Sequence, residues 1–339
     1  MTDDKTRDDI AIRVDRLHKT FGGEDGTTAV DGVSFEVPSG SVVGILGPNG
    51  AGKTTTIKSI LGLVQPDAGE IEVSNIDVRE QPRAAYARMG AILEGARNIY
   101  WRLTVRENLE FFAGLGGDHP ERLRERHDRL LERFELADWA DTPVRELSRG
   151  MKQKVSLATT LARDVDVVFM DEPTLGLDVE ASVELRSELR RLSADEEVTV
   201  VLTSHDMDVI EQVCDSVILL TDGSVLTHEE VDRLIDTFRT KEYRVTLAAP
   251  VSDDVRRRVE RVTDADWERS GDRVSVAFRA PRGETVYDVV ELLSDAGIEL
   301  RDIESMEPNL EDVFLHLTEE TTESSEFDGL DQVAERGRS

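Results

Sequence analysis

The segment GPNGAGKT, residues 47–54, limits the possible folds more than any other part of the chain. It fits the pattern G-x-x-x-x-G-K-[ST], follows the apolar run Val42–Leu46 and precedes a stretch with helical spacing. Glycines let backbone N–H groups turn inward around phosphate oxygens, and the following helix N-terminus adds a favourable dipole. Lys53 can reach the β- and γ-phosphates, and the Thr54 hydroxyl can bind Mg²⁺. The segment therefore predicts an α/β protein with a phosphate-binding loop.

A second motif, VVFMDEP at residues 167–173, combines a buried strand with two carboxylates. The strand brings Asp171 to the carboxyl edge of a sheet, where ligands of open α/β sheets bind. Asp171 can hold Mg²⁺ through water, and Glu172 can polarise an attacking water as a general base. A merely solvated Asp-Glu pair is the alternative, and the phosphate-binding loop argues against it.

A third motif, LSRGMKQKV at residues 147–155, opens a predicted helix. Ser148 offers a hydroxyl and Gly150 a free N–H group, and both suit an anion at a helix N-terminus. An ordinary serine-capped helix fits the same residues when the motif is taken alone.

The remaining pattern predicts subdomains around the α/β core. Short apolar runs between glycine-rich turns in residues 10–46 indicate a small antiparallel sheet. Residues 95–163 show helical spacing, and Thr104 with Glu107 forms a capping box at one helix start. Apolar strands then alternate with helices, which predicts a parallel sheet covered on both faces. These strands are residues 165–170, 198–203 and 216–220.

A smaller α+β domain is predicted after the core. Residues 224–240 are interpreted as a helical link, and the domain boundary is placed near 235–241. From Glu242 onward the expected order is β-α-β-β-α-β, which is typical of a ferredoxin-like fold. Both chain ends are polar and lack sustained periodicity. The predicted regions are a flexible tail (1–9), the domain with the phosphate-binding loop (10–234), an accessory domain (242–317) and an acidic disordered tail (318–339).

The chain is strongly acidic, with 71 Asp and Glu against 41 Lys and Arg and a net charge of −30. Such a surface repels nucleic acid phosphates and anionic lipid headgroups, so no nucleic acid partner is expected. The charge suits either a solvated surface at high salt or an acidic patch for a basic partner. Scarce lysine beside abundant Asp and Glu resembles cytosolic proteins of salt-accumulating organisms, and indicates a halophilic archaeon.

Cys214 is the only cysteine, so no disulfide can form within the chain, which fits a reducing cytoplasm. The N-terminal segment MTDDKTRDD is too polar for a signal peptide. No apolar run approaches the roughly 18 residues needed to span a bilayer. Any membrane-spanning part is therefore expected from another chain.

Together, the three motifs resemble those of the ATP-binding cassette (ABC) ATPases over residues 10–230. The resemblance identifies residues 147–151 as the ABC signature, usually LSGGQ. It implies that Ser148 and Gly150 bind the γ-phosphate of ATP held by a second subunit, with Mg²⁺ as the second cofactor. The nucleotide-binding loop would comprise Gly47, Pro48, Asn49, Gly50, Ala51, Gly52, Lys53, Thr54 and Thr55.

The resemblance assigns roles to further residues. Phe21 matches the aromatic residue that stacks on adenine, although a core Phe near a turn is the alternative. Asp178, in LGLD, matches the loop that connects the two sites, and His205 matches the switch histidine that contacts the γ-phosphate. Glu94 stands where the family usually has Gln, and could bind Mg²⁺ directly or through water. The implied catalytic residues are Glu172, His205 and Lys53, and the implied metal ligands are Thr54, Asp171 and Glu94.

Departures from the usual signature indicate a subgroup. Arg149 and Met151 replace Gly and Gln, and this SRGM form resembles drug-export ATPases, including those for daunorubicin resistance. The resemblance implies an exporter subunit at the cytoplasmic face of the membrane. It would form a dimer, expected to be a homodimer, and act on a separate membrane-spanning permease. Tyr100 and Trp101, in NIYWRL, either pack in the helical subdomain or line a groove for a short helix of the permease.

Other function classes fit less well. Soluble ABC ATPases of translation or DNA repair usually hold two cassettes or a long coiled-coil insertion, and this chain has one cassette without such an insertion. A scaffold that binds ATP without turnover would not need intact Lys53, Asp171, Glu172 and His205. A P-loop kinase or GTPase would leave the signature unexplained. The sequence does not specify the transported substrate.

Overall fold

The computed structural model describes two compact units, Met1–Val231 and Asp232–Ser339. The predicted tails fall outside the described residues except for Asp9 and Thr318. The described residues are 9–22, 26–93, 99–117, 123–163, 165–237, 242–248, 251–270, 273–280, 283–306, 309–315 and 317–318.

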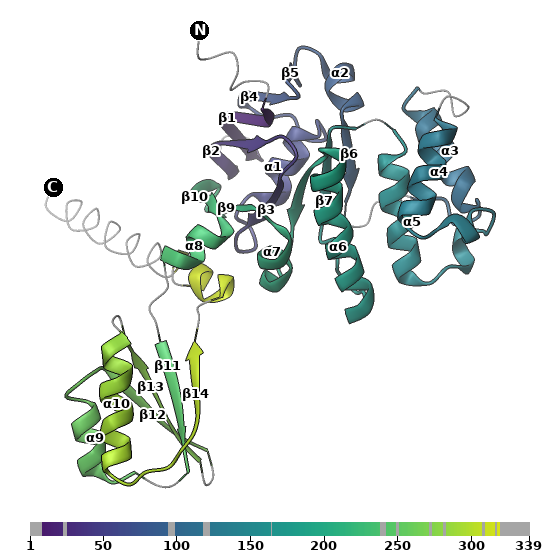
Figure 1. The fold of residues 1–339 in the computed structure, drawn as a ribbon. Coiled ribbons are helices and arrows are strands. Elements are labelled where there is room, and N and C mark those ends of the chain that lie inside the picture. The colour runs from purple at the N-terminus through teal and green to yellow at the C-terminus, as the bar shows by residue number, and fades with distance from the viewer. Residues whose placement is uncertain are drawn as a thin grey trace, which may run out of the picture. The chain divides into compact units, whose positions relative to one another are not determined.

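The first unit contains a four-stranded antiparallel sheet and a six-stranded, mostly parallel sheet (Figure 1). The antiparallel sheet has the order β2-β1-β4-β5, with β1 (Ile10–Phe21), β2 (Thr27–Pro38), β4 (Ala68–Val73) and β5 (Ile76–Asp77). The larger sheet has the order β10-β9-β3-β8-β7-β6. Its strands are β3 (Val42–Leu46), β6 (Met89–Ile92), β7 (Val167–Asp171), β8 (Thr199–Thr203), β9 (Ser216–Thr221) and β10 (Ser224–Glu230).

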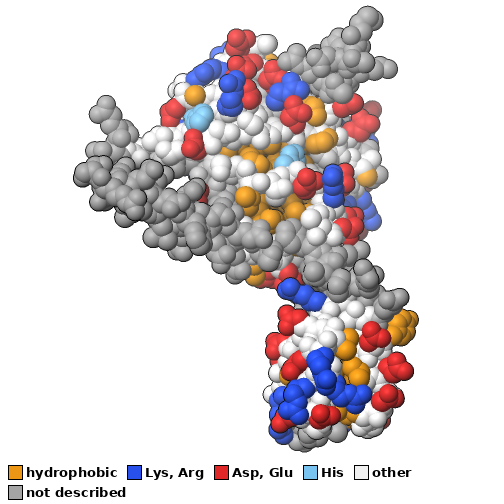
Figure 2. Space-filling view, turned by 90° about the vertical axis from the view of Figure 1, so that its left-hand side faces the viewer, with side chains coloured by type: hydrophobic (Ala, Val, Ile, Leu, Met, Phe, Trp, Pro, Cys, Tyr) orange, Lys and Arg blue, Asp and Glu red, His pale blue; other side chains and the backbone are white. Residues whose placement is uncertain are grey.

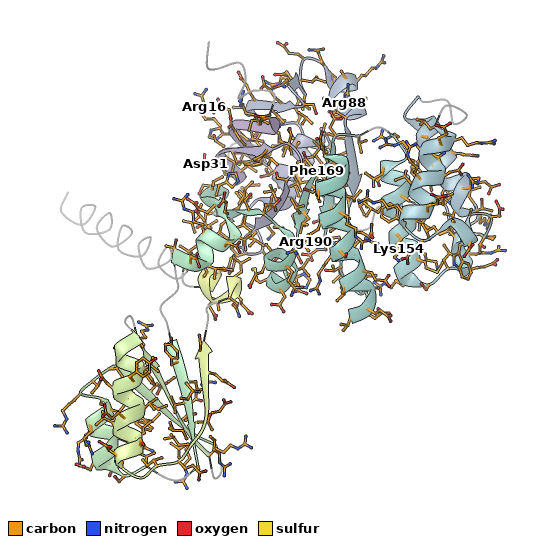
Figure 3. The ribbon with its side chains drawn as sticks, viewed as in Figure 1. Arg16, Asp31, Arg88, Lys154, Phe169 and Arg190 are labelled. Carbon is orange, nitrogen blue, oxygen red and sulfur yellow. The ribbon has the colours of Figure 1, made fainter. Side chains whose placement is uncertain are left out.

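The central strands are apolar because helices cover both faces of the larger sheet. All five residues of β3 and all five of β8 are buried, as a parallel strand covered on both faces requires. One hydrophobic core includes Leu17 of β1, Ile45 of β3 and Ile57 of the first helix, so it joins both sheets. Phe169 of β7 is fully buried in this core (Figure 3). The helices outside the helical subdomain are α1 (Lys53–Ile60), α2 (Pro82–Ala87), α6 (Val179–Glu196) and α7 (Met207–Val213).

Three helices form a separate subdomain at the end of the unit away from the antiparallel sheet (Figure 1). The predicted capping box is present, since Thr104 Oγ1 accepts from Glu107 N at 3.2 Å and Thr104 N donates to Glu107 Oε2 at 2.8 Å. The helices are α3 (Val105–Leu115), α4 (Arg124–Arg133) and α5 (Arg149–Leu161), with 3₁₀ turns at Ala137–Trp139 and Val144–Glu146.

The predicted helical link at residues 224–240 is wrong in its first half. Strand β10 pairs antiparallel with β9, and helix α8 (Val231–Thr237) begins only afterwards. The turn between the strands holds Asp222 and Gly223 at φ 50° and 79°. Asp-Gly is a strong hairpin signal, because both positions tolerate positive φ.

The second unit has one antiparallel sheet with the strand order β12-β13-β11-β14. Its hydrophobic core includes Val245, Val276, Phe278 and Leu293, and two helices lie on one face of the sheet (Figure 1). Its elements are β11 (Glu242–Leu247), α9 (Asp253–Val259), β12 (Ala265–Ser270), β13 (Arg273–Arg279), α10 (Gly283–Asp295) and β14 (Leu300–Met306).

The charged side chains of the first unit are mixed on the visible face. Figure 2 shows Asp and Glu interspersed with Lys and Arg over this face, with no single acidic patch on it. No helix of the described residues is both long and apolar enough to cross a membrane.

Candidate active site

The phosphate-binding loop joins the end of β3 to the start of α1. Gly47 and Gly52 have φ angles of 149° and 98°, which L side chains rarely adopt. A Cβ at Gly47 would collide with the carbonyl oxygen of Leu220, and one at Gly52 with that of Ala29. Both positions therefore require glycine. By contrast, Pro48, Asn49, Gly50 and Thr54 are exposed, as a ligand-facing surface should be.

Lys53 begins α1 and its side chain bends back over the loop. Its Nζ donates to the carbonyl oxygens of Gly47 at 2.5 Å and Pro48 at 3.0 Å. Burial lowers the pKa of Lys53, and the negative charges of Glu172 and Asp171 oppose this shift. The ammonium group and the two carboxylates therefore act on one another across the same site.

The two carboxylates stand at the carboxyl end of β7, two strands away from β3 in the sheet. Thr203, which ends the intervening strand β8, donates its hydroxyl to Asp171 Oδ1 at 2.5 Å. The carboxyl ends of β3, β8 and β7 thus bring the phosphate loop, the carboxylates and Thr203 to one edge. Sequence analysis missed Thr203. The sequence pattern that marks Thr203 is a hydroxyl residue at the end of an apolar strand, directly before Ser204 and His205.

Glu172 is held in an uncommon backbone conformation and is paired with His205. Its φ is 51°, and its N–H donates to the Thr203 carbonyl oxygen at 3.1 Å. His205 Nδ1 lies 2.8 Å from Glu172 Oε2, where the side chains are 72% and 18% exposed. A non-glycine residue at positive φ costs on the order of 1–3 kcal/mol and often occurs at functional sites. The backbone strain and the histidine together fix where the Glu172 carboxylate points.

Phe21 ends β1 and lies opposite Thr27 of β2. Two residues further along β2, the Ala29 carbonyl lies against Gly52 of the phosphate loop. The Phe21 ring is 45% exposed, and Lys19 Nζ lies 5.4 Å from its centroid. Phe21 is therefore exposed on a strand next to the phosphate-binding loop. The alternative interpretation, in which Phe21 packs in the core, does not fit this position.

Ser148 and Asp178 cap the helices that they precede. Ser148 Oγ accepts from Met151 N at 3.2 Å at the start of α5. Asp178 Oδ1 accepts from Ala181 N at 2.9 Å at the start of α6. Gly150 lies close to the first turn of α6, since a Cβ placed on it would be 3.0 Å from Ala181 Cβ. The structure therefore brings the signature and the Asp178 loop together within one chain.

The Mg²⁺ ligands predicted from the sequence are partly described. Thr54 is exposed in the first turn of α1, and Asp171 is half-buried at the end of β7. The prediction for Glu94 lies outside the described residues.

Comparisons with known proteins identify a family for this chain. The family model described as "ABC transporter" matches residues 30–175. The daunorubicin resistance ATP-binding protein DrrA3 of Streptomyces coeruleorubidus is 36% identical over 314 residues, which cover 91% of this chain and 96% of that protein. The chain belongs to the ABC transporter ATP-binding subunits. Members of this family bind and hydrolyse ATP, which confirms the predicted enzyme class.

Other relatives of this ABC subunit agree with the assignment. The Nod factor export ATP-binding protein I of Ralstonia nicotianae is 34% identical over 319 residues, which cover 91% of this chain and 93% of the relative. A solved ATP-binding subunit of an ABC transporter is 30% identical and superposes with a TM-score of 0.58 over 67% of this chain and 93% of its own. A dimeric ATP-binding cassette bound to ADP and Pi is 28% identical, with a TM-score of 0.56 over 65% and 98%. These matches confirm the α/β cassette fold of the first unit.

Proposed function

We propose that this chain is the ATPase subunit of an ABC exporter, in which two ATPase chains act on a separate membrane-spanning permease. The main support is the edge formed by β3, β8 and β7, which gathers Lys53, Asp171 and Glu172. Relatives named for daunorubicin resistance and for Nod factor export support an exporter. Such a subunit would work at the cytoplasmic face of the membrane.

In this proposal each residue of the edge has a separate task. The N–H groups of the phosphate loop and Lys53 bind the β- and γ-phosphates of ATP. Thr54 and Asp171 supply hard oxygen donors that fit Mg²⁺, and this ion neutralises phosphate charge when bound. Glu172 takes a proton from the attacking water, and His205 holds the Glu172 carboxylate in place at 2.8 Å. Thr203 orients Asp171 by its hydrogen bond.

The signature would act on the ATP of the second chain. Ser148 and Gly150 stand at the N-terminus of α5, where the helix dipole and free N–H groups favour the γ-phosphate. Asp178 begins the next helix beside them and would reach the interface with them. The dimeric form of the similar ADP-bound cassette supports a two-chain arrangement. A homodimer is the simplest assembly of this kind.

Phe21→Ala is expected to weaken ATP binding by about 1–3 kcal/mol, because a stacking platform for the adenine base is lost. The turnover number at saturating ATP should stay near the wild-type value. Phe21→Tyr keeps an aromatic ring and serves as the matched control. Titration with a fluorescent ATP analogue measures both affinities, and an unchanged dissociation constant for Phe21→Ala would exclude Phe21 as the adenine contact.

An exposed aromatic cluster in the helical subdomain offers the contact surface for the permease. Tyr100 is 49% exposed, and its ring centroid lies 4.7 Å from that of Phe111. Trp101 is 53% exposed, and Leu115 at the end of α3 is 67% exposed. Large exposed aromatic residues are typical anchors of protein interfaces.

Replacing both Tyr100 and Trp101 by Ala is expected to uncouple the subunit from its permease. Co-purification with the permease and transport-stimulated ATPase activity should both fall about tenfold or more, because two anchors are lost. The basal ATPase activity of the isolated subunit should not change. Trp139→Ala is the control, since Trp139 is an exposed aromatic residue of the same subdomain, in the 3₁₀ turn Ala137–Trp139. Unaltered assembly and coupling in the double variant would refute this surface.

For the second unit we infer a ferredoxin-like fold. The element order β11-α9-β12-β13-α10-β14 and the sheet order β12-β13-β11-β14 support this assignment. The high content of Asp and Glu also supports adaptation to high salt, as in halophilic archaea, and the face shown in Figure 2 carries these charges dispersed among Lys and Arg.

A further inference from the structure

The first turns of α5 are attached to the segment that follows Glu172. Arg149 Nη2 donates to the Leu175 carbonyl oxygen at 3.2 Å, and Gln153 Nε2 donates to the Pro173 carbonyl oxygen at 3.1 Å. Gly176 has a φ of 72°, and a Cβ there would collide with the Arg149 guanidinium group. Side chains one helical turn apart on α5 therefore bind consecutive parts of the same loop.

An ion pair extends this attachment to α6. Lys154 Nζ lies 2.9 Å from Glu184 Oε2, and Figure 3 shows Lys154 on the side of α5 toward α6. A second carboxylate, Glu135, lies 3.5 Å from the same ammonium group. The Lys154 side chain is only 16% exposed, whereas those of Glu184 and Glu135 are 48% and 81% exposed. A largely buried ammonium group needs such partners.

The balance of forces on Lys154 favours its charged form. Burial alone lowers the pKa of Lys154, but the hydrogen bonds and negative charges of Glu184 and Glu135 outweigh it and raise the pKa overall. Lys154 therefore carries its charge at neutral pH.

A second ion pair lies one helical turn further along α6. Glu188 is 8% exposed as a residue, and its Oε2 lies 3.5 Å from Arg133 Nε of α4. Glu184 and Glu188 are spaced i,i+4, so they share one face of α6. That face thus binds a cation from α5 and another from α4, which fixes the helical subdomain to α6 at two points.

We propose that Lys154 and Glu184 are positioning residues for ATP hydrolysis, which hold the signature turn of α5 in register with the Asp178 loop. Both motifs then reach the ATP of the second chain as one rigid body. The inference rests on the proposed two-chain site, since only there do Ser148 and Gly150 meet a phosphate. Displacements near 1 Å of groups that position a reactant can cost about 100-fold in rate.

Lys154→Met tests this role by removing the charge while keeping an unbranched side chain. We expect the turnover number to fall about 10- to 100-fold, because the signature turn loses its fixed position. The affinity of one chain for ATP should stay within about twofold, since Phe21 and the phosphate loop bind it. A purely structural role predicts no loss of turnover in a Lys154→Met variant that remains folded.

Three further variants make the test specific. Lys154→Arg keeps the charge and should retain most of the turnover. Glu135→Gln removes the exposed partner of Lys154 and leaves the α6 contact, so it should hydrolyse ATP like the wild type. Glu184→Gln should match Lys154→Met, and the double variant should lose no more than either single one, because both act through one contact. Wild-type turnover in Lys154→Met, or additive losses in the double variant, would overturn the proposal.

Trapping the ATP-bound dimer with Glu172→Gln separates this inference from the proposed function. We expect Glu172→Gln to dimerise with ATP in size-exclusion chromatography, and the added Lys154→Met substitution to raise the ATP concentration required about tenfold or more. Absence of any dimer in Glu172→Gln would overturn both the two-chain site and the positioning role. Equal dimerisation with and without Lys154→Met would overturn the positioning role alone.

Discussion

Glu172→Gln should bind ATP normally but hydrolyse it about 10²- to 10⁴-fold more slowly, the usual contribution of a general base. The amide has the same shape as the carboxylate and can still contact His205, but it cannot accept a proton from water. Glu172 is well placed as the base, because its φ of 51° and its 2.8 Å contact with His205 fix the position of its carboxylate.

A single-turnover assay of phosphate formation in acid-quenched samples checks this result without interference from product release. Glu197→Gln is the matched control, because Glu197 is exposed, also has a positive φ (56°), and lies at the far end of α6. A rate near that of the wild type for Glu172→Gln would exclude Glu172 as the base.

Lys53→Met is expected to lower ATP hydrolysis about 10²- to 10³-fold, because a preorganised cation is removed from the phosphates. In the structure Lys53 Nζ is held by the carbonyl oxygens of Gly47 and Pro48, so little reorganisation is needed on binding. Partial burial strengthens its field on the phosphates. The variant should also bind ATP more weakly.

Lys58→Met is the control for this substitution, since Lys58 is an exposed lysine near the end of the same helix. Steady-state hydrolysis and ATP titration of the two variants provide the comparison. Equal loss in both would indicate a general effect on α1 rather than a phosphate contact by Lys53.

Local sequence signals predicted much of the fold and the phosphate loop. The glycines of residues 47–54 adopt positive φ angles that other residues rarely adopt. The capping box of Thr104 and Glu107 is complete within four residues. Such features depend only on residues that are close in the sequence, so the sequence alone is sufficient to predict them. The missed strand β10 also had a local signal in Asp222-Gly223, but residues 224–240 were interpreted as one helix.

Features that depend on tertiary structure could not be predicted in the same way. The pairing of Glu172 with His205 joins a residue that directly follows β7 to one in the segment that follows β8, 33 positions apart in the chain. Nothing in the sequence indicates that Glu172 has a positive φ. The contact of Lys154 with Glu184 likewise requires the packing of α5 on α6. A charged residue on a helix has many potential partners, and only the fold selects one.

The central claim is that each active site combines the phosphate loop of one chain with the signature of another. It is tested most directly by mixing two inactive variants, Lys53→Met and Ser148→Asp. Aspartate preserves the helix cap of α5 but repels the γ-phosphate. In a mixed dimer, one site combines the altered phosphate loop with the altered signature. The other site combines an intact phosphate loop with an intact signature.

We expect each variant alone to be nearly inactive. The equimolar mixture should recover about a quarter of the wild-type ATPase rate, since half of randomly formed dimers are mixed and each has one intact site. A mixture no more active than the two variants measured separately, or a Ser148→Asp variant with wild-type activity, would contradict the two-chain site.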